Sequence, residues 1–339
     1  MKVLIVGGRK GKMSGIITKL HDIMSKEDDC DVTTFNSIIP RLDIKENDLI
    51  LWMPDISNDE EKIYPVKGRG AVLICSKVMR EDTTRIDAVS RIFNMHGNAV
   101  VMINKHVGAH GQVFEFELVD ALNNTWCKTT NLEALVVSIL RLQTWTNSSK
   151  RRSLGYEALG SHSWKPEYNE TDLAKFMSLN EGLALKVASG CGNRFFGNFS
   201  TRCTKLFPSH KLSITAFFFS ARNSNKKSLT EEDLVLCDQY KYYGERKPSV
   251  DTPVQLEIYK NFPEINYMIH GHAYINKAKT TKNYYPCGDL REVRGVLNLM
   301  ETGETKINLR KHGFLLVGKT IRDMERHYVS SKFSMIGDK

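Results

Sequence analysis

The stretch "NYMIHGHAYI", residues 266–275, places two histidines one residue apart in a run that otherwise has the composition of a buried strand. Successive side chains of a strand point to opposite faces, so His270 and His272 are expected on one face and Gly271 on the other. Two imidazoles on one face can bind a divalent metal ion. A catalytic zinc site, however, usually has three protein ligands and one open position. A metal site here therefore needs a third ligand from elsewhere in the chain.

The candidate third ligand is His312 in "KHGFLLVG", where it opens another apolar strand, expected to run across "INLRKHGFLLVG". A histidine pair alone is weak evidence, because paired histidines also occur in cores and interfaces. A third histidine that enters a second strand of the same half of the chain favours metal binding. The sequence therefore predicts a site formed by His270, His272 and His312.

Length and composition indicate a globular protein of two domains. The chain has 339 residues, of which 41% are hydrophobic and 26% charged, which suits two cores of ordinary size. Its longest apolar runs, "AFFFSA" and "LEALVVSIL", are far shorter than the ~20 residues that cross a bilayer. The first residues lack a secretory pattern, and the seven cysteines form no CxxC pair, as expected of reduced thiols. These features predict a cytoplasmic protein without a membrane partner.

The net charge of +9 is spread along the chain and is not clustered with aromatic residues. This distribution favours a basic surface or attraction for phosphorylated small molecules over a nucleic-acid partner.

The first half alternates apolar runs with helix-period segments. The runs "KVLIVGG", "DLILWMPDI", "GAVLICSKVM" and "NAVVMINK" are typical of strands buried on both faces of a parallel sheet. Residues 1–150 are therefore predicted to form a doubly wound, Rossmann-like parallel sheet. The polar and basic segment "TNSSKRRS", residues 146–153, is the expected linker.

A phosphate-binding turn is one interpretation of "GGRKGKMSG", residues 7–15, where Arg9, Lys10 and Lys12 precede a helix. The glycines do not form GxGxxG, and the second strand, near "CDVTTFNS", lacks the acidic residue expected to bind a ribose. A plain tight turn is therefore favoured over a nucleotide site.

Residues 151–339 follow another pattern, with strands joined by irregular connections and helices beside them, which predicts an antiparallel sheet covered by helices. Within this half, "GNFSTR" (197–202), "KPSVDTPVQLEIYKNFPEINYMIHGHAYI" (247–275), "YPCGDLREV" and "KHGFLLVG" follow one another. In this order they resemble landmarks of the class II aldolase/adducin family, over about residues 179 to 328. The resemblance implies an α/β/α sandwich with a mainly antiparallel sheet, zinc or another divalent metal on the three histidines, and a homotetramer with sites between subunits.

The resemblance also implies an activity. Zinc would polarise the carbonyl and hydroxyl of a phosphorylated or nucleotide-linked sugar, so that a neighbouring carbon–carbon bond can break in a retro-aldol reaction. The expected enzyme is an aldolase, that is, a lyase. Alternatives are a 4-epimerase of the ribulose-5-phosphate type, which uses the same chemistry, a dehydratase, and a non-catalytic adducin-like scaffold. The three histidines favour an enzyme over a scaffold. A nicotinamide-dependent dehydrogenase in the first half is disfavoured by the missing glycine fingerprint.

Several residue roles follow from the same resemblance. Asp251, where the aldolases have glutamate, is the candidate base or a further metal contact, but it is equally a helix N-cap before "TPVQLEIY". The family's threonine-glycine phosphate loop is replaced by "AFFFSARNS" and its second serine by Val250, so the phosphate pocket is expected to be weakened. Its expected remnants are Asn198, Ser200, Arg202 and Ser249.

Two other groups of residues have ordinary structural interpretations. Asp289 and Glu292 are expected to form a capping box for "LREVRGVL" and to take no part in catalysis. The loop between His272 and Pro286 is shorter than in the aldolases or epimerases, in which it commonly carries a catalytic group, so a different substrate or reaction is one expectation. A tyrosine phenol is the candidate for protonation. The candidates are Tyr274, Tyr284, Tyr285 and Tyr328, although packing is the expected role of each.

Overall fold

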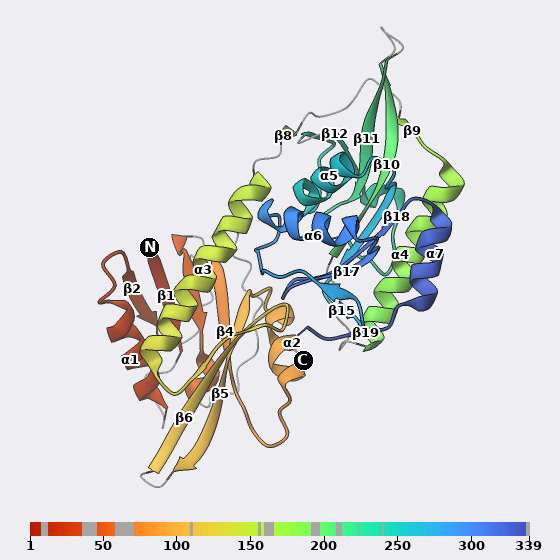
Figure 1. Cartoon of the computed structure of the whole chain (residues 1–339). Coiled ribbons are helices and arrows are strands. Elements are labelled where there is room, and N and C mark those ends of the chain that lie inside the picture. Colours follow the sequence, from red (N-terminus) through yellow and green to blue (C-terminus); the bar gives the residue numbers. More distant parts are fainter. Residues whose placement is uncertain are drawn as a thin grey trace. The chain divides into compact units, whose positions relative to one another are not determined.

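The computed structural model of the chain describes residues 1–7, 13–35, 46–57, 71–108, 111–154, 157–158, 166–190, 197–207, 212–222, 224–238 and 241–336. The chain divides into two compact units, Met1–Asn147 and Ser148–Lys339, and is mixed α/β throughout (Figure 1). Within the described part, no helix is both long and apolar enough to cross a membrane.

The first unit is built on a seven-stranded sheet in the order β2-β1-β3-β4-β5-β6-β7. The pairs from β2 to β5 are parallel, whereas β6 and β7 are added antiparallel. The elements are β1 (Lys2–Val6), α1 (Ser14–Met24), β2 (Asp31–Phe35), β3 (Leu49–Trp52), η2 (Pro54–Ser57), β4 (Val72–Val78), α2 (Arg85–Asn94), β5 (Ala99–Gly108), β6 (Gly111–Asp120), β7 (Thr125–Thr129) and α3 (Leu132–Leu154).

Helices cover both faces of this sheet, because successive strand residues point to opposite sides. Val3 and Ile5 of β1 pack in one core with α1 and α3. Leu4 and Val6 pack in the other core with α2. The strands β1, β3 and β4 are therefore buried on both faces, which explains their almost uninterrupted apolar composition.

Two features of this unit differ from the sequence-based expectation. The antiparallel strands β6 and β7 were not predicted, because they follow β5 without an intervening helix, whereas the predicted parallel sheet alternates strand and helix. Residues 146–153 contain the boundary between the two units, which lies between Asn147 and Ser148, but the segment is helical and belongs to α3, which ends at Leu154. The segment contains no Gly or Pro to end the helix, and its lysine and arginines favour helix. The candidate phosphate-binding residues Arg9, Lys10 and Lys12 lie outside the described residues.

The second unit is built on a mainly antiparallel sheet in the order β16-β17-β18-β14-β10-β11-β12-β13-β8, with β9 paired to β10. Apolar cores lie on both its faces, with α5 and α6 packed on one and α4 and α7 on the other. The elements are β8 (Glu157–Ala158), β9 (Pro166–Glu167), α4 (Glu170–Gly190), β10 (Gly197–Phe207), β11 (Leu212–Ser220), η3 (Glu231–Asp233), β12 (Leu234–Asp238), β13 (Lys241–Tyr243), α5 (Thr252–Asn261), β14 (Tyr267–Gly271), β15 (Tyr274–Ile275), β16 (Lys279–Thr280), α6 (Arg291–Glu301), β17 (Lys306–Leu309), β18 (Gly313–Gly318), α7 (Ile321–Ser330) and β19 (Phe333–Ser334).

The segment expected as one strand across "INLRKHGFLLVG" is instead a hairpin of β17 and β18. The chain reverses at Lys311, whose φ of 57° lies in the left-handed region. His312 is therefore in the turn that precedes β18 and does not lie within a strand. Similarly, β14 ends at Gly271, so His272 lies in the bend that follows it.

Candidate metal centre

His270 is held in the middle of the second sheet. Its strand, β14, pairs with β10 on one side and with β18 on the other. The imidazole is 1% exposed, and its Nδ1 lies 2.9 Å from the carbonyl oxygen of Phe314. That carbonyl can only accept, so Nδ1 carries the hydrogen and Nε2 presents its lone pair. Within the described part of the chain, Nε2 has no hydrogen-bond partner.

His312 reaches the same place from the β17–β18 hairpin. Its Nδ1 lies 3.1 and 3.2 Å from the two carboxylate oxygens of Glu292. Its Nε2 faces the other way, 3.2 Å from the sulfur of Cys287. An imidazole that donates from one nitrogen to a carboxylate and offers the other nitrogen is the usual arrangement of a metal-binding histidine.

The three imidazoles converge, although His272 lies in a bend and His312 in a turn and neither lies within a strand. The ring centroid of His270 lies 4.8 Å from that of His272 and 4.7 Å from that of His312, and the remaining pair is 5.5 Å apart. One ligand atom each from Asp251 and the three histidines lies within 4.8 Å of the others. The second unit therefore contains a histidine and aspartate cluster that could hold a metal ion.

Asp251 belongs to this cluster and does not cap a helix. It stands at the N-cap position of α5, but its side chain makes no capping hydrogen bond. Its carboxylate instead accepts from the Asn198 side chain at 3.2 Å and from the Gly288 N–H at 2.8 Å. The carboxylate oxygens lie 3.7 Å from Nε2 of His270 and 3.9 Å from Nε2 of His312. Of the two interpretations from sequence, the geometry thus disfavours the cap.

The protonation states of the histidines suit the binding of a cation. Burial, followed by the neighbouring His312, lowers the pKa of His270 to about 4. Burial and the two other imidazoles hold the pKa of His272 well below its usual value. Both rings are therefore neutral at pH 7, the form in which histidine binds metals. Burial also acts to lower the pKa of His312, but Cys287 and Glu292 together raise it well above its usual value. With two neutral rings, the orphaned Nε2 of His270 and the carboxylate of Asp251, the donor set fits a divalent metal.

Glu292 has a role that the sequence did not predict. The expected capping box is only half formed. Asp289 Oδ1 accepts the backbone N–H of Arg291 at 3.0 Å, and the carboxylate also accepts from the Arg291 side chain at 2.7 Å. The Asp289 N–H, however, donates to the Pro286 carbonyl and not to Glu292. The Glu292 carboxylate, 2% exposed, orients His312 as described above. Burial raises the pKa of Glu292, opposed by His312. The only sequence signal was an acidic residue on the apolar face of a helix.

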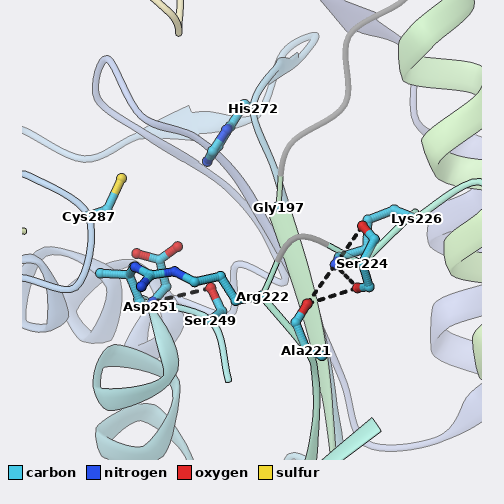
Figure 2. Close-up of a pocket in the computed structure, with 10 residues that line it drawn as sticks. Gly197, Ala221, Arg222, Ser224, Lys226, Ser249, Asp251, His272 and Cys287 are labelled. Carbon is cyan, nitrogen blue, oxygen red and sulfur yellow. Dashed lines mark hydrogen bonds between the residues drawn. The ribbon is translucent and has the colours of Figure 1, made fainter. Parts of the chain in front are cut away.

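A cavity of about 240 Å³ opens beside the cluster. In Figure 2, His272, Cys287 and Asp251 lie around one side of this cavity, and Ser249 and Arg222 lie near Asp251. Ser224 and Lys226 line it from the loop after β11. The cavity thus has the candidate ligands on one side and basic, hydroxyl-bearing side chains on another.

The basic residues of the cavity, Arg222 and Lys226, lie in or just after "AFFFSARNS", the segment that replaces the family's phosphate loop. Lys226 is buried, and its Nζ donates to the carbonyl oxygens of Ala221 at 3.2 Å and Ser224 at 3.3 Å, and also to the Ser224 hydroxyl. The backbone N–H of Arg222 donates to the Lys247 carbonyl at 2.8 Å. The loop is thereby closed on itself and attached to the Ser249 turn. A signal was present in the sequence, since "SARNSNKK" is rich in basic and polar residues.

The four predicted substrate-binding residues separate into two groups. Ser249 lines the cavity. The side-chain amide of Asn198 donates to the Ser249 hydroxyl at 2.9 Å. Ser200 lies inside the fold and is bonded to Gln255 at 2.6 Å. Arg202 donates to the carbonyl oxygens of Tyr259 and Ile265 at 3.0 and 3.1 Å. The side chains of Ser200 and Arg202 are therefore used in packing.

The tyrosines considered as proton donors have other contacts in the structure. Tyr274 accepts at its hydroxyl from the N–H of Lys311 at 2.7 Å, which supports the turn that carries His312. The ring of Tyr328 lies 5.1 Å from the ammonium of Lys186, and the ring of Tyr285 lies 5.1 Å from the guanidinium of Arg291. The rings of Tyr285 and Tyr328 therefore pack against cationic side chains, as expected, whereas Tyr274 is used through its hydroxyl. Tyr284 is not among the residues that line the cavity.

Comparison with known proteins agrees with this description. The model of the Class II Aldolase and Adducin N-terminal domain matches residues 183–286. This segment contains Asp251, His270 and His272, and His312 lies beyond it.

One relative is the L-fuculose phosphate aldolase of Methanococcus maripaludis, 27% identical over 116 residues. The match covers 28% of this chain and spans 63% of the relative's length. Among solved structures, the N-terminal class II aldolase domain of a conserved protein from Thermoplasma acidophilum is 16% identical, with a TM-score of 0.36, over 49% of this chain and 93% of that one. An aldolase II superfamily protein from Pseudomonas syringae is 15% identical, with a TM-score of 0.34, over 48% and 74%.

Proposed function

We propose that this protein is a divalent-metal-dependent aldolase that cleaves a carbon–carbon bond in an anionic sugar derivative, with a sugar phosphate as the first candidate and zinc as the metal. The observation that carries the proposal is the convergence of His270, His272, His312 and Asp251 beside a cavity lined by basic side chains. A divalent cation held by the three histidines would supply Lewis acidity, which stabilises negative charge as it develops on a substrate oxygen.

The residues around the cavity would supply the base and the groups that bind the substrate. Asp251 is the candidate base, because its carboxylate lines the cavity and is held in place by Asn198 and Gly288. It would accept the proton of the substrate hydroxyl next to the bond that breaks. Arg222 and Ser249 would bind the anionic group by charge-assisted and neutral hydrogen bonds. Lys226 would hold the loop after β11, which carries Arg222, through its hydrogen bonds to Ala221 and Ser224.

The 4-epimerase is the second candidate, favoured by one observation. Asp251 stands where the aldolases have glutamate, and "KPSVDTP" resembles the epimerase motif more nearly. An epimerase would cleave the same bond, turn the aldehyde fragment within the cavity and rejoin it. The non-catalytic scaffold is disfavoured, since a scaffold does not need three converging imidazoles.

We propose that residues 1–150 are a Rossmann-like domain and residues 151–339 the metal-binding domain, in a cytoplasmic homotetramer. The parallel order β2-β1-β3-β4-β5, with helices on both faces, supports the first assignment. The match of the class II aldolase/adducin family model to residues 183–286 supports the second.

Two measurements test the function. Elemental analysis of the purified protein should find about one divalent metal per chain, His270→Ala should lose it, and His106→Ala, an exposed control in the first unit, should keep it. Incubation with a panel of pentulose and hexulose phosphates should then give fragments for an aldolase, or an unchanged mass with altered configuration for an epimerase. Full metal content in His270→Ala would refute the proposed site.

A further inference from the structure

Cys287 stands where no metal ligand was predicted. It lines the cavity, and its sulfur lies 3.2 Å from Nε2 of His312, the nitrogen that this histidine presents to the cluster. Among the cysteines of the described residues, only Cys287 has its sulfur within hydrogen-bond distance of an imidazole nitrogen. Burial raises the pKa of Cys75 and Cys203 to about 12, so these two thiols stay protonated in the core.

The backbone fixes Cys287 at this position. The next residue, Gly288, donates its N–H to the carboxylate of Asp251 at 2.8 Å. Gly288 has a φ of 75°, and a Cβ atom there would lie 2.5 Å from the carbonyl oxygen of Val250. The turn that carries the thiol is therefore packed tightly against the turn that carries Asp251. The thiol and the carboxylate are held together on one side of the cavity (Figure 2).

The spacing suits two ligands of one cation. A nitrogen bound at ~2.1 Å and a sulfur bound at ~2.3 Å to the same zinc lie roughly 3 to 3.6 Å apart for angles from 90° to the tetrahedral value. The separation of 3.2 Å between Cys287 and His312 falls in this range. Independently, Nε2 of His270 is buried, has no hydrogen-bond partner within the described residues and lies 3.7 Å from Asp251.

We propose that Cys287 is a thiolate ligand of the same metal, so that the centre offers nitrogen, oxygen and sulfur donors and selects zinc, cobalt or cadmium over magnesium and manganese. The inference rests on the proposed function, because it requires the metal centre. On binding, the S–H bond breaks, its proton passes to water, and the electron pair left on sulfur forms the bond to the metal. Thiolates favour such softer cations, whereas carboxylate and water sites suit magnesium and manganese.

Cobalt provides a direct test that does not depend on activity. The metal-free full-length protein is loaded with one equivalent of Co²⁺, and bound cobalt is counted by elemental analysis. We expect the wild-type protein to show a sulfur-to-cobalt charge-transfer band in the near ultraviolet. Cys287→Ser should still bind cobalt but lose this band, and the control Cys30→Ser, in the first unit, should keep it. Cys287→Ser should also lose at least about tenfold in its preference for zinc over manganese.

The outcomes separate this inference from the proposed function. Wild-type protein that binds one cobalt without the band, or Cys287→Ser that retains it, overturns the sulfur ligand and leaves the metal centre intact. Wild-type protein that binds no cobalt, zinc or manganese overturns both. Cys287→Ala is measured in parallel, and a cooperative thermal transition in each variant shows that loss of the band is not loss of the fold.

Discussion

At the scale of single residues, the candidate centre depends on how each ring nitrogen is used. His270 donates from Nδ1 to a backbone carbonyl, and His312 is paired through Nδ1 with Glu292. In both rings Nε2 is left to face the cluster. The identity of the ligand residues is thus only part of the site, because the groups behind them set the tautomer and the ring orientation.

Glu292→Gln tests this orienting role. The substitution keeps the shape of the side chain but removes the charge behind His312, so we expect metal affinity to fall about 10- to 100-fold. Competition with a chelating dye measures it. Glu301→Gln, at the exposed end of the same helix, is the matched control and should not change the affinity. Equal affinities for both variants would show that Glu292 does not support the ligand.

A pair of arginines distinguishes substrate binding from packing. Arg222→Ala should raise KM for an anionic substrate about tenfold or more, because a charge-assisted hydrogen bond is lost. Arg202→Ala should instead lower the free energy of unfolding by about 2 kcal/mol, since the guanidinium packs on the rings of Phe217 and Tyr259. Steady-state kinetics and denaturant titration measure the two effects. A selective rise in KM for Arg202→Ala would restore the role suggested by the sequence.

At the scale of elements, the candidate site is assembled at the ends of strands. His272 follows β14, His312 precedes β18, Arg222 follows β11, and Cys287 lies in the turn before α6. Strands give these turns fixed starting points, while the turns themselves can differ without disturbing the sheet.

Gly288→Ala tests the turn that holds Asp251. Both Gly288 (φ 75°) and Gly303 (φ 86°) have left-handed backbones, but only the former would bring a Cβ atom against a carbonyl oxygen. Gly303→Ala should cost about 1 kcal/mol of unfolding free energy from backbone strain alone. Gly288→Ala should cost about 1 to 3 kcal/mol more and should also weaken metal binding. Equal losses in the two variants would contradict the close contact.

The loop after β11 gives a pH-dependent prediction. Burial lowers the pKa of Lys226 to about 8 from 10.5, with Asp233 acting to raise it and Arg246 to lower it. The folded state therefore disfavours the charged lysine, and this cost is fully present below about pH 8 and disappears as pH rises towards 10.5. Relative to Lys226→Met, the wild-type protein should gain up to about 3 kcal/mol of unfolding free energy across that window. Denaturant titrations at several pH values measure the difference. Lys282→Met, an exposed control, should show no such gain.

At the scale of the whole molecule, the chain has two units with separate cores. The core clusters of the described residues each draw on one unit only. The candidate metal ligands lie entirely within Ser148–Lys339, so metal binding should stabilise this unit selectively.

Calorimetry tests that selectivity. With zinc at about 100 times its Kd, the transition of the second unit should gain about 2.7 kcal/mol, while the transition of the first unit should not move. His312→Ala should abolish the gain. A shift of both transitions by zinc would indicate that the two units unfold together.

The sequence by itself determined the apolar runs, the helix periods and the three histidines, because local pattern and residue type decide which segments become strands or helices and which side chains can bind a metal. Its interpretation failed at "INLRKHGFLLVG", where a left-handed Lys311 makes a turn. At residues 146–153 it predicted the boundary between the units but not that this segment is helical, because a polar composition is compatible with a helix as well as with a loop.

Only the tertiary structure decided which residues meet. Glu292 and Cys287 join His312, and Arg222 and Lys226 line the cavity, although none was assigned to the site from sequence. Arg202, which was assigned to it, is instead bonded to the backbone carbonyls of Tyr259 and Ile265. These side chains come from separate turns, and neither spacing nor composition specifies contacts between distant turns. Strand pairing and core packing fix those contacts when the chain folds.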